Sequence, residues 1–166
     1  MLVADLFPGV GSSRPQSLLG LNGVLYFSAT GPDGARTLWR SDGTAAGTQP
    51  VRSDADAPMN PTHLTLAAGQ LIFSAADAAH GREVWRSDGT AAGTSLLQDL
   101  VPGVESSLPQ TFIATRKHLY LTAYTEQTGN ELWAMPLAEE PVPPSTPSTP
   151  STPEIVSRMY LPMTLR

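Results

Sequence analysis

Two aspartates, Asp42 and Asp88, are the residues whose type and setting best suit the binding of a cation or a sugar. Each lies in the same string, Ser-Asp-Gly-Thr-Ala-Ala-Gly-Thr, which also supplies threonine hydroxyls. Calcium takes roughly six to eight oxygen ligands, and one carboxylate per string falls short of that set. The strings match neither the EF-hand loop nor the calcium-binding β-helix repeat. Asp42 and Asp88 are therefore candidate calcium ligands in an incomplete set.

The same strings have a second interpretation, as tight turns between strands. An aspartate at the start of a turn accepts the backbone N–H two residues further on, and glycine adopts the positive φ that the turn requires. Gly43 and Gly89 follow the two aspartates, and Thr44 and Thr90 are expected to restart the strand. The sequence favours these turns over a metal site.

Three tryptophans, Trp39, Trp85 and Trp133, are separated by 46 and 48 residues. They are candidates for a surface that stacks on sugars or binds peptides. Each follows an aliphatic residue at the same place in an apolar run, and a recurring large aromatic side chain suits the space between stacked sheets. We therefore predict that the tryptophans are repeat-core residues.

No set of residues indicates catalysis. The chain has no cysteine, which excludes disulfides, thiolate metal sites and cysteine nucleophiles. Its sequence contains no Gly-x-Ser-x-Gly elbow and no phosphate-binding Gly-x-x-x-x-Gly-Lys-Ser/Thr loop. We name no catalytic residue and no cofactor apart from the candidate calcium, and predict that the protein is not an enzyme.

The tryptophans belong to a tandem repeat. LWRSDGTAAGT at 38–48 recurs as VWRSDGTAAGT at 84–94, and ELWAMP at 131–136 is a third, shortened copy. A proline lies 24 residues before each tryptophan, at Pro15, Pro61 and Pro109. We divide residues 1–137 into three units at 15–60, 61–108 and 109–137. Residues 1–14 match the last strand and spacer of a preceding unit, because they align with 95–108 at an offset of 94.

Each unit is expected to contain four short strands. In the first unit these are 17–21, 24–28, 37–41 and about 49–52, separated by Asn22-Gly23, Asp33-Gly34 and Asp42-Gly43. The chain has 14 glycines and 16 prolines, which disfavour a helical repeat. The prediction is an all-β, propeller-like tandem repeat of three four-stranded blades in an open or incomplete ring.

The repeated string resembles the bacterial ELWxxDGT repeat, together with the Asp-Leu-x-Pro-Gly-x-x-Ser-Ser spacers at 5–13 and 99–107. The resemblance covers residues 1 to about 137. It implies a secreted or cell-surface array without a general enzymatic activity. The chain departs from the pattern at Thr37, which replaces the glutamate, and at 135–136, where the turn string is missing. The acidic residue at position 5 comes before any basic or apolar region of a signal peptide could form, so no signal peptide is predicted in this chain.

Three units are fewer than the roughly four to eight blades that close a propeller. Met1–Leu6 could supply the outer strand missing from the third unit and pin a three-blade assembly. Otherwise the units form an open arc, whose exposed blade faces would allow self-association.

Composition argues against nucleic acid and membranes as partners, and it distinguishes the C-terminal end from the repeat units. Ten basic and 15 acidic residues give a net charge of −5, which suits neither nucleic acid nor an anionic membrane. No apolar run is long enough to span a bilayer. Residues 138–154, with three successive Ser-Thr-Pro triplets, are expected to form a disordered Pro/Ser/Thr linker. Residues 155–166 form a short apolar segment, which is expected to be a disordered end, a short strand packed on the repeats, or a sorting or attachment segment.

These observations predict a non-enzymatic secreted or cell-surface β-repeat module for binding or adhesion, with an unknown protein or glycan surface as partner. The first alternative is a structural spacer from a longer repeat array. The second alternative is a calcium-dependent carbohydrate-binding module that uses Asp42 and Asp88.

Overall fold

The described part of the chain folds into eleven β-strands and contains no helix. The structure, a computed structural model, describes residues 1–54 and 56–137. The linker predicted at 138–154 and the apolar segment predicted at 155–166 lie outside the described residues. Over the rest of the chain the all-β prediction is confirmed.

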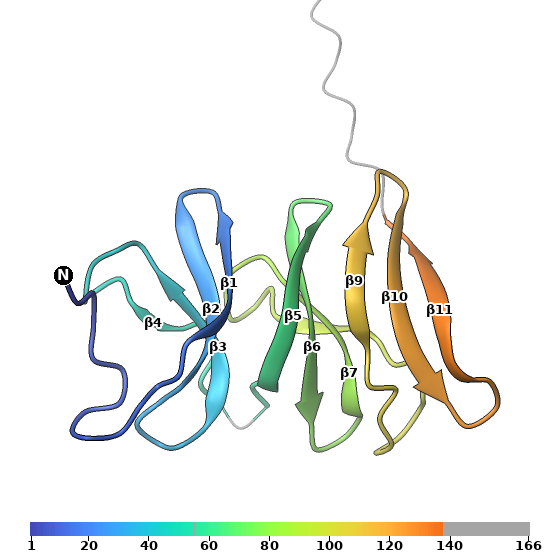
Figure 1. Cartoon of the computed structure of the whole chain (residues 1–166), viewed down its shortest axis with the longest axis horizontal. Helices are drawn as coiled ribbons and strands as arrows, with labels where there is room; N and C mark the ends of the chain where they lie inside the picture. Colours follow the sequence, from blue (N-terminus) through green and yellow to red (C-terminus); the bar gives the residue numbers. More distant parts are fainter. Residues whose placement is uncertain (55, 138–166) are drawn as a thin grey trace, which may run out of the picture.

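The first two repeat units each form a four-stranded antiparallel sheet in which strands follow one another in chain order (Figure 1). Sheet 1 contains β1 (Gln16–Leu21), β2 (Val24–Thr30), β3 (Arg36–Ser41) and β4 (Gln49–Pro50). Sheet 2 contains β5 (Met59–Ala67), β6 (Gln70–Asp77), β7 (Gly81–Ser87) and β8 (Ser95–Gln98). The strands predicted for the first unit differ from the observed ones by at most two residues at either end.

The third unit has three strands rather than the predicted four. Sheet 3 contains β9 (Gln110–Ala114), β10 (His118–Thr125) and β11 (Gly129–Pro136). In the first two units a Ser-Asp-Gly-Thr turn leads from the third strand to the fourth. Met135 and Pro136 replace the start of that turn, and the described residues end soon after β11.

Local sequence explains the tight connections. Asn22 and Gly23 have φ values of 52° and 78°, the left-handed pair that a two-residue hairpin requires. Leu21 and Val24 accordingly pair across the turn. The hairpin predicted from Asn-Gly is therefore present between β1 and β2.

Each unit opens on an irregular first strand around its proline. In each unit, the residue immediately before the proline and the second residue after it have positive φ. These residues are Arg14, Ser17, Asn60, His63, Leu108 and Thr111. The pairing register of the first strand with the second shifts in this region in all three sheets. A guanidinium N–H of Arg36 donates to the carbonyl of Arg14 at 2.9 Å, and Arg82 donates likewise to Asn60 at 3.0 Å.

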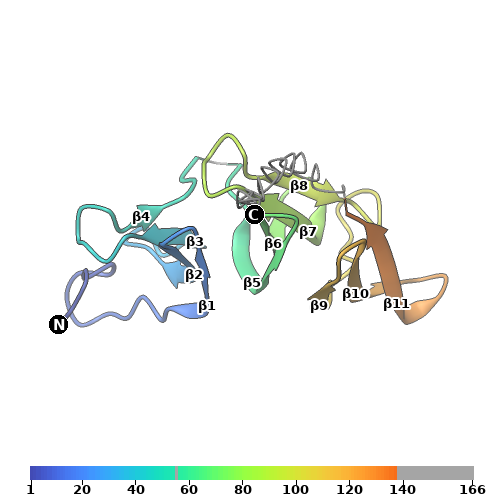
Figure 2. The same ribbon diagram turned by 90° about the horizontal axis from the view of Figure 1, so that it is seen from above.

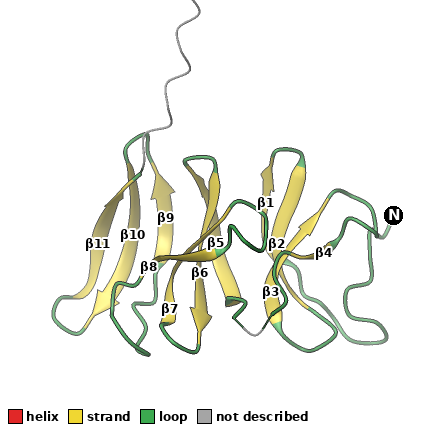
Figure 3. Ribbon diagram, turned by 180° about the vertical axis from the view of Figure 1, so that it is seen from behind, coloured by secondary structure: helices red, strands yellow, loops and turns green. Residues whose placement is uncertain are grey.

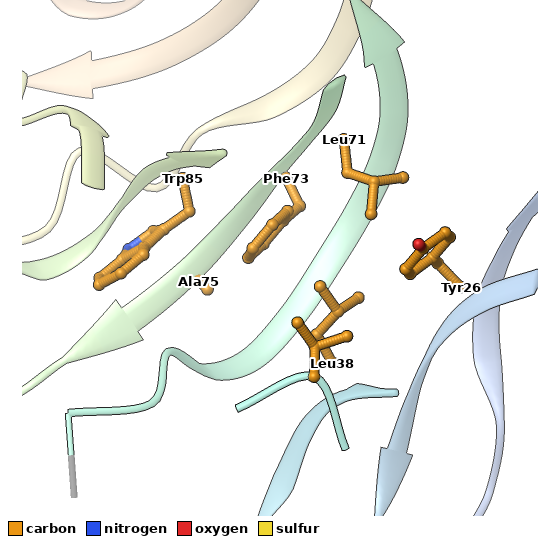
Figure 4. Packing of buried hydrophobic residues seen from close by; sticks show 7 residues of the cluster. Tyr26, Leu38, Leu71, Phe73, Ala75 and Trp85 are labelled. Carbon is orange, nitrogen blue, oxygen red and sulfur yellow. The ribbon is translucent and has the colours of Figure 1, made fainter. Parts of the chain in front are cut away.

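The three sheets stand side by side in an arc, with β1, β5 and β9 along one side of it (Figure 2). Apolar side chains fill the spaces between neighbouring sheets. Tyr26 and Leu38 of sheet 1 pack against Leu71, Phe73 and Trp85 of sheet 2 (Figure 4). The opposite face of sheet 2 packs against sheet 3 through Ile72, Val84, Phe112, Leu119 and Leu121.

The N-terminal residues do not complete sheet 3. Residues 1–15 form no strand, and Figure 3 shows them as a loop beside sheet 1. Leu6 packs against Phe27, Ala29 and Trp39 of that sheet. The alternative in which Met1–Leu6 pins the third unit within one chain is therefore wrong, because this segment lies against the first sheet, at the other end of the arc.

None of the described residues belongs to a helix long and apolar enough to cross a membrane.

Candidate functional site

An open cavity lies beside sheet 1, between β3 and the segment that leads to sheet 2. Its volume is about 480 Å³. Most of its wall is apolar and comes from Pro32, Trp39, Pro50, Ala57 and Met59. The polar side chains that line it are Asp33, Thr37, Ser53 and Asp54.

The corresponding space in the second unit is filled. Glu83 occupies the position of Thr37 and is fully buried. Its carboxylate accepts the backbone N–H groups of Leu100 and Ser107, at 3.0 and 2.8 Å, and the Ser107 hydroxyl at 2.6 Å. The chain between the sheets also packs closely here, because a Cβ added to Gly81 would meet the backbone oxygens of residues 104 and 105.

Two sequence differences therefore open the cavity in the first unit. Thr37 is shorter than glutamate and cannot reach the connecting segment. That segment is also two residues shorter after the first unit than after the second. Sequence reasoning missed this cavity although the replacement of glutamate by Thr37 was visible.

The carboxylates of the cavity are held in different ways. Asp33 accepts the N–H of Ala35 at 3.0 Å within its turn. Asp54 accepts a 2.8 Å hydrogen bond from Arg52, which lowers the pKa of Asp54 and keeps it ionised. Arg52 also reaches the carbonyl of Thr94 in the next unit, at 3.4 Å. The cavity wall is thus fixed to both sheets and carries two carboxylates beside an apolar surface, of which Asp54 is paired with Arg52.

The tryptophans are core residues to different degrees. Trp39 is 7% exposed and Trp85 4%, whereas Trp133, in sheet 3, is half-buried. The indole N–H of Trp133 donates to the carbonyl of Ala123 at 3.2 Å. The indole nitrogens of Trp39 and Trp85 are buried without an acceptor among the described residues. Trp39 combines this unpaired donor with a place in the cavity wall.

Asp42 and Asp88 lie in self-contained turns. Asp42 Oδ1 accepts the N–H and the hydroxyl of Thr44, at 2.9 and 2.7 Å, and Asp88 binds Thr90 in the same way. These hydrogen bonds lower the pKa of both aspartates. The glycines that follow, Gly43 and Gly89, have φ values of +91°.

The threonines of these turns do not restart the strand, contrary to the prediction. Thr44 caps the loop instead: its hydroxyl accepts the N–H of Gly47, and its carbonyl accepts the hydroxyl of Thr48. Gly47 has no room for a Cβ, because the Asp42 carboxylate lies there. The strand resumes only at Gln49. Within the described ranges no three histidine or acidic side chains gather in a group that could hold a metal ion.

Comparison with protein-family models, with curated proteins and with solved structures found no match.

Proposed function

We propose that this protein is a non-enzymatic binding module, built from propeller-like blades, that takes a saccharide unit in the cavity beside Trp39. The observation that carries the proposal is the cavity itself, opened at one unit of the array where Thr37 replaces a glutamate. In a tandem repeat, residues shared by all units maintain the fold. A cavity that arises where one unit differs from the shared pattern is therefore a candidate binding site.

The chemistry of the walls supports a saccharide. A sugar ring has apolar C–H faces and a rim of hydroxyls, and suits a site with an aromatic wall and a few well-placed polar groups. Trp39, Pro50 and Met59 supply the apolar wall, and Asp33 and Asp54 supply hydrogen-bond acceptors. The resemblance to surface repeat arrays supports placing this module outside the cell or on its surface.

Binding of the full chain to a printed array of oligosaccharides tests the proposal. Thr37→Glu restores the residue of the second unit and places a longer, charged side chain in the cavity, whereas Thr37→Val keeps the size of the side chain. We expect the natural chain and Thr37→Val to bind the same glycans and Thr37→Glu to bind none, with all three equally stable to urea. Absence of any bound glycan, or equal binding by Thr37→Glu, would contradict the proposal.

The second candidate function is a structural spacer, and the burial of the tryptophans favours it. Trp39 and Trp85 lie within the core rather than in an exposed aromatic cluster on one rim. A spacer would hold other domains apart without a ligand. In that case Thr37→Glu would change no binding property of the chain.

A calcium-dependent carbohydrate site at Asp42 and Asp88 has weaker support. One oxygen of each carboxylate already accepts two hydrogen bonds from a threonine. The two turns belong to different sheets, and each contributes a single carboxylate.

A further inference from the structure

The contact between sheets 1 and 2 and the contact between sheets 2 and 3 use corresponding faces of the sheets. We call the face of a sheet that packs on the following sheet its forward face, and the opposite one its backward face. The forward face of sheet 1 includes Leu19, Tyr26 and Leu38, and the backward face of sheet 2 includes Phe73 and Trp85. The forward face of sheet 2 meets the backward face of sheet 3 in the same way.

The forward face of sheet 3 has no sheet against it among the described residues. Ile113, Tyr120 and Leu132 correspond to Leu19, Tyr26 and Leu38, each at an offset of 94 residues. Leu132 is 71% exposed and Ile113 58%, whereas Leu38 is 2% exposed. The last sheet thus presents to solvent nearly the same apolar side chains that the first sheet buries against the second.

The backward face of sheet 1 is the matching surface. Four of its residues are identical to those of the corresponding face of sheet 2, which packs against Tyr26 and Leu38; they are Leu25, Phe27, Ala29 and Trp39. An open cavity of about 440 Å³ lies between this face and residues 1–6. Leu2, Val3, Leu6, Leu25 and Phe27 line it with apolar atoms.

The position of Leu6 is compatible with a sheet packed on this face, whereas residues 1–4, which line the cavity, would move away from it to join β11 of another copy. Leu6 packs on Phe27 and Trp39, and Leu100, 94 residues later, lies in the contact between sheets 2 and 3. A connecting segment at this place is therefore part of a formed contact between sheets. Among the described residues, the backward face of sheet 1 lacks a forward face opposite it.

The strand edges match as the faces do. In sheet 2 the edge of β7 pairs with β8, with Trp85 opposite Leu96 and Arg86 opposite Ser95. In sheet 3 the strand β11 is at the edge of the sheet. Residues 1–4 correspond to β8 at the offset of 94 and belong to no strand, and Leu2, the equivalent of Leu96, is 78% exposed.

We propose that copies of this chain associate head to tail, the forward face of sheet 3 in one copy packing on the backward face of sheet 1 in the next. Residues 1–4 of the second copy add to β11 as the fourth strand of sheet 3. The contact reproduces the one already formed between sheets 1 and 2. Two copies bring six sheets together, which lies within the roughly four to eight blades at which propellers close. In a ring of two copies, both end faces of each copy pack against the other copy. The proposal does not depend on a ligand in the cavity beside Trp39.

Light scattering of the full chain across a range of concentrations tests this contact. Leu132→Glu places a charge on the forward face of sheet 3, and Leu2→Glu places one on the strand that would add to β11. Val104→Glu is the matched control, because Val104 is 69% exposed and lies on neither surface. All three side chains replaced here are exposed in the single chain, so the variants keep its core.

We expect the natural chain and Val104→Glu to form a species of twice the 17.6 kDa chain mass, and each of the other two variants to be monomeric. An equimolar mixture of Leu132→Glu and Leu2→Glu should regain a dimer, because each variant retains one intact surface. A natural chain that stays monomeric, with its own residues 138–166 covering the face or with nothing covering it, overturns the proposal. A dimer that resists Leu2→Glu, or variants that fail to complement each other, indicates another mode of association and overturns it equally.

Discussion

The hydroxyl of Ser107 donates a 2.6 Å hydrogen bond to the carboxylate of Glu83, and both side chains are fully buried. Ser107 lies in the segment that joins the second unit to the third, so this contact holds the connection between units against the edge of β7. The backbone N–H groups of Ser107 and Leu100 bind the same carboxylate. One acidic side chain thus satisfies three donors that would otherwise be buried without an acceptor.

Replacing Glu83 by glutamine should lower the free energy of unfolding by about 1–3 kcal/mol, because the amide nitrogen cannot accept a hydrogen bond and leaves one buried donor unpaired. Urea denaturation of the two proteins measures the difference. Glu131→Gln is the matched control, since Glu131 holds the same position in the third unit but is exposed. Equal effects of the two substitutions would contradict the role given to Glu83.

Titration of Glu83 should contribute to the pH dependence of the free energy of unfolding. Burial raises the pKa of Glu83 above its ordinary value of 4.5, although the hydrogen bonds from Ser107 and Leu100 oppose the shift. A raised folded-state pKa contributes stability that is fully present below the unfolded pKa and is lost as pH rises through the folded one. The protonated carboxyl group retains two oxygens that can accept a hydrogen bond, which glutamine does not.

The free-energy advantage of the natural chain over Glu83→Gln should therefore be larger at pH 4 than at pH 8. Urea titrations of both proteins at a series of pH values measure this advantage directly. Taking the difference removes the contributions of the other acidic residues, such as Asp88, whose pKa is shifted downwards. An advantage that grows with pH would show that the hydrogen bonds outweigh burial.

The tryptophans should differ in their contribution to stability according to burial. Trp85→Ala removes a side chain between sheets 1 and 2 and should cost about 3–5 kcal/mol. Trp133→Ala should cost less, because Trp133 is half-buried. Tyr124, which is exposed on β10, provides the control, and Tyr124→Ala should change stability by less than about 0.5 kcal/mol. Equal losses at Trp85 and Trp133 would contradict the difference in packing.

Asp88 should act as a turn residue and not as a metal ligand. Asp88→Ala removes the acceptor for the N–H and hydroxyl of Thr90 and should lower the melting temperature by roughly 2–4 °C. Asp88→Asn keeps an acceptor oxygen and should lose less. We expect the melting temperature of the natural chain to be the same in calcium and in a chelator. A rise with calcium that Asp88→Ala abolishes would instead indicate a binding site.

Sequence predicted most of what depends on local chemistry. The Asn22-Gly23 hairpin follows from two residues that tolerate left-handed φ, and the period of the tryptophans follows from the repetition of one sheet per unit. Thr44 was misjudged because its role depends on Asp42 and Gly47 folding back onto it, which no strand pattern records.

Other features depend on how units meet, and sequence reasoning reached them only in part. The cavity beside Trp39 arises because Thr37 is shorter than the equivalent Glu83 and because the connection to the next unit is shortened. Both differences can be seen in the sequence, but their effect on the space between sheet and connection cannot. The resemblance of residues 1–6 to β8 indicates a strand that could complete the third unit. Their place beside sheet 1 follows from the packing of Leu6 on Phe27 and Trp39.

Backbone strain at the start of each unit supplies a last prediction. Thr111 has a φ of 52°, which is unfavourable for a β-branched residue, and the equivalent positions, Ser17 and His63, have φ values of 52° and 56°. Glycine adopts this conformation without a Cβ clash, so Thr111→Gly should raise the free energy of unfolding by up to about 1 kcal/mol despite the entropy that glycine loses on folding.

The neighbouring residue separates this effect from that of glycine alone. Gln110 has no positive φ, so Gln110→Gly relieves no strain and should lower the free energy of unfolding by roughly 0.5–1 kcal/mol. His63→Gly, at the equivalent position of the second unit, should be stabilising like Thr111→Gly, because the same irregular strand start recurs there. Urea denaturation of the three variants compares them directly. If Thr111→Gly and Gln110→Gly are destabilising to the same degree, position 111 carries no strain and the left-handed start is not a shared feature of the units.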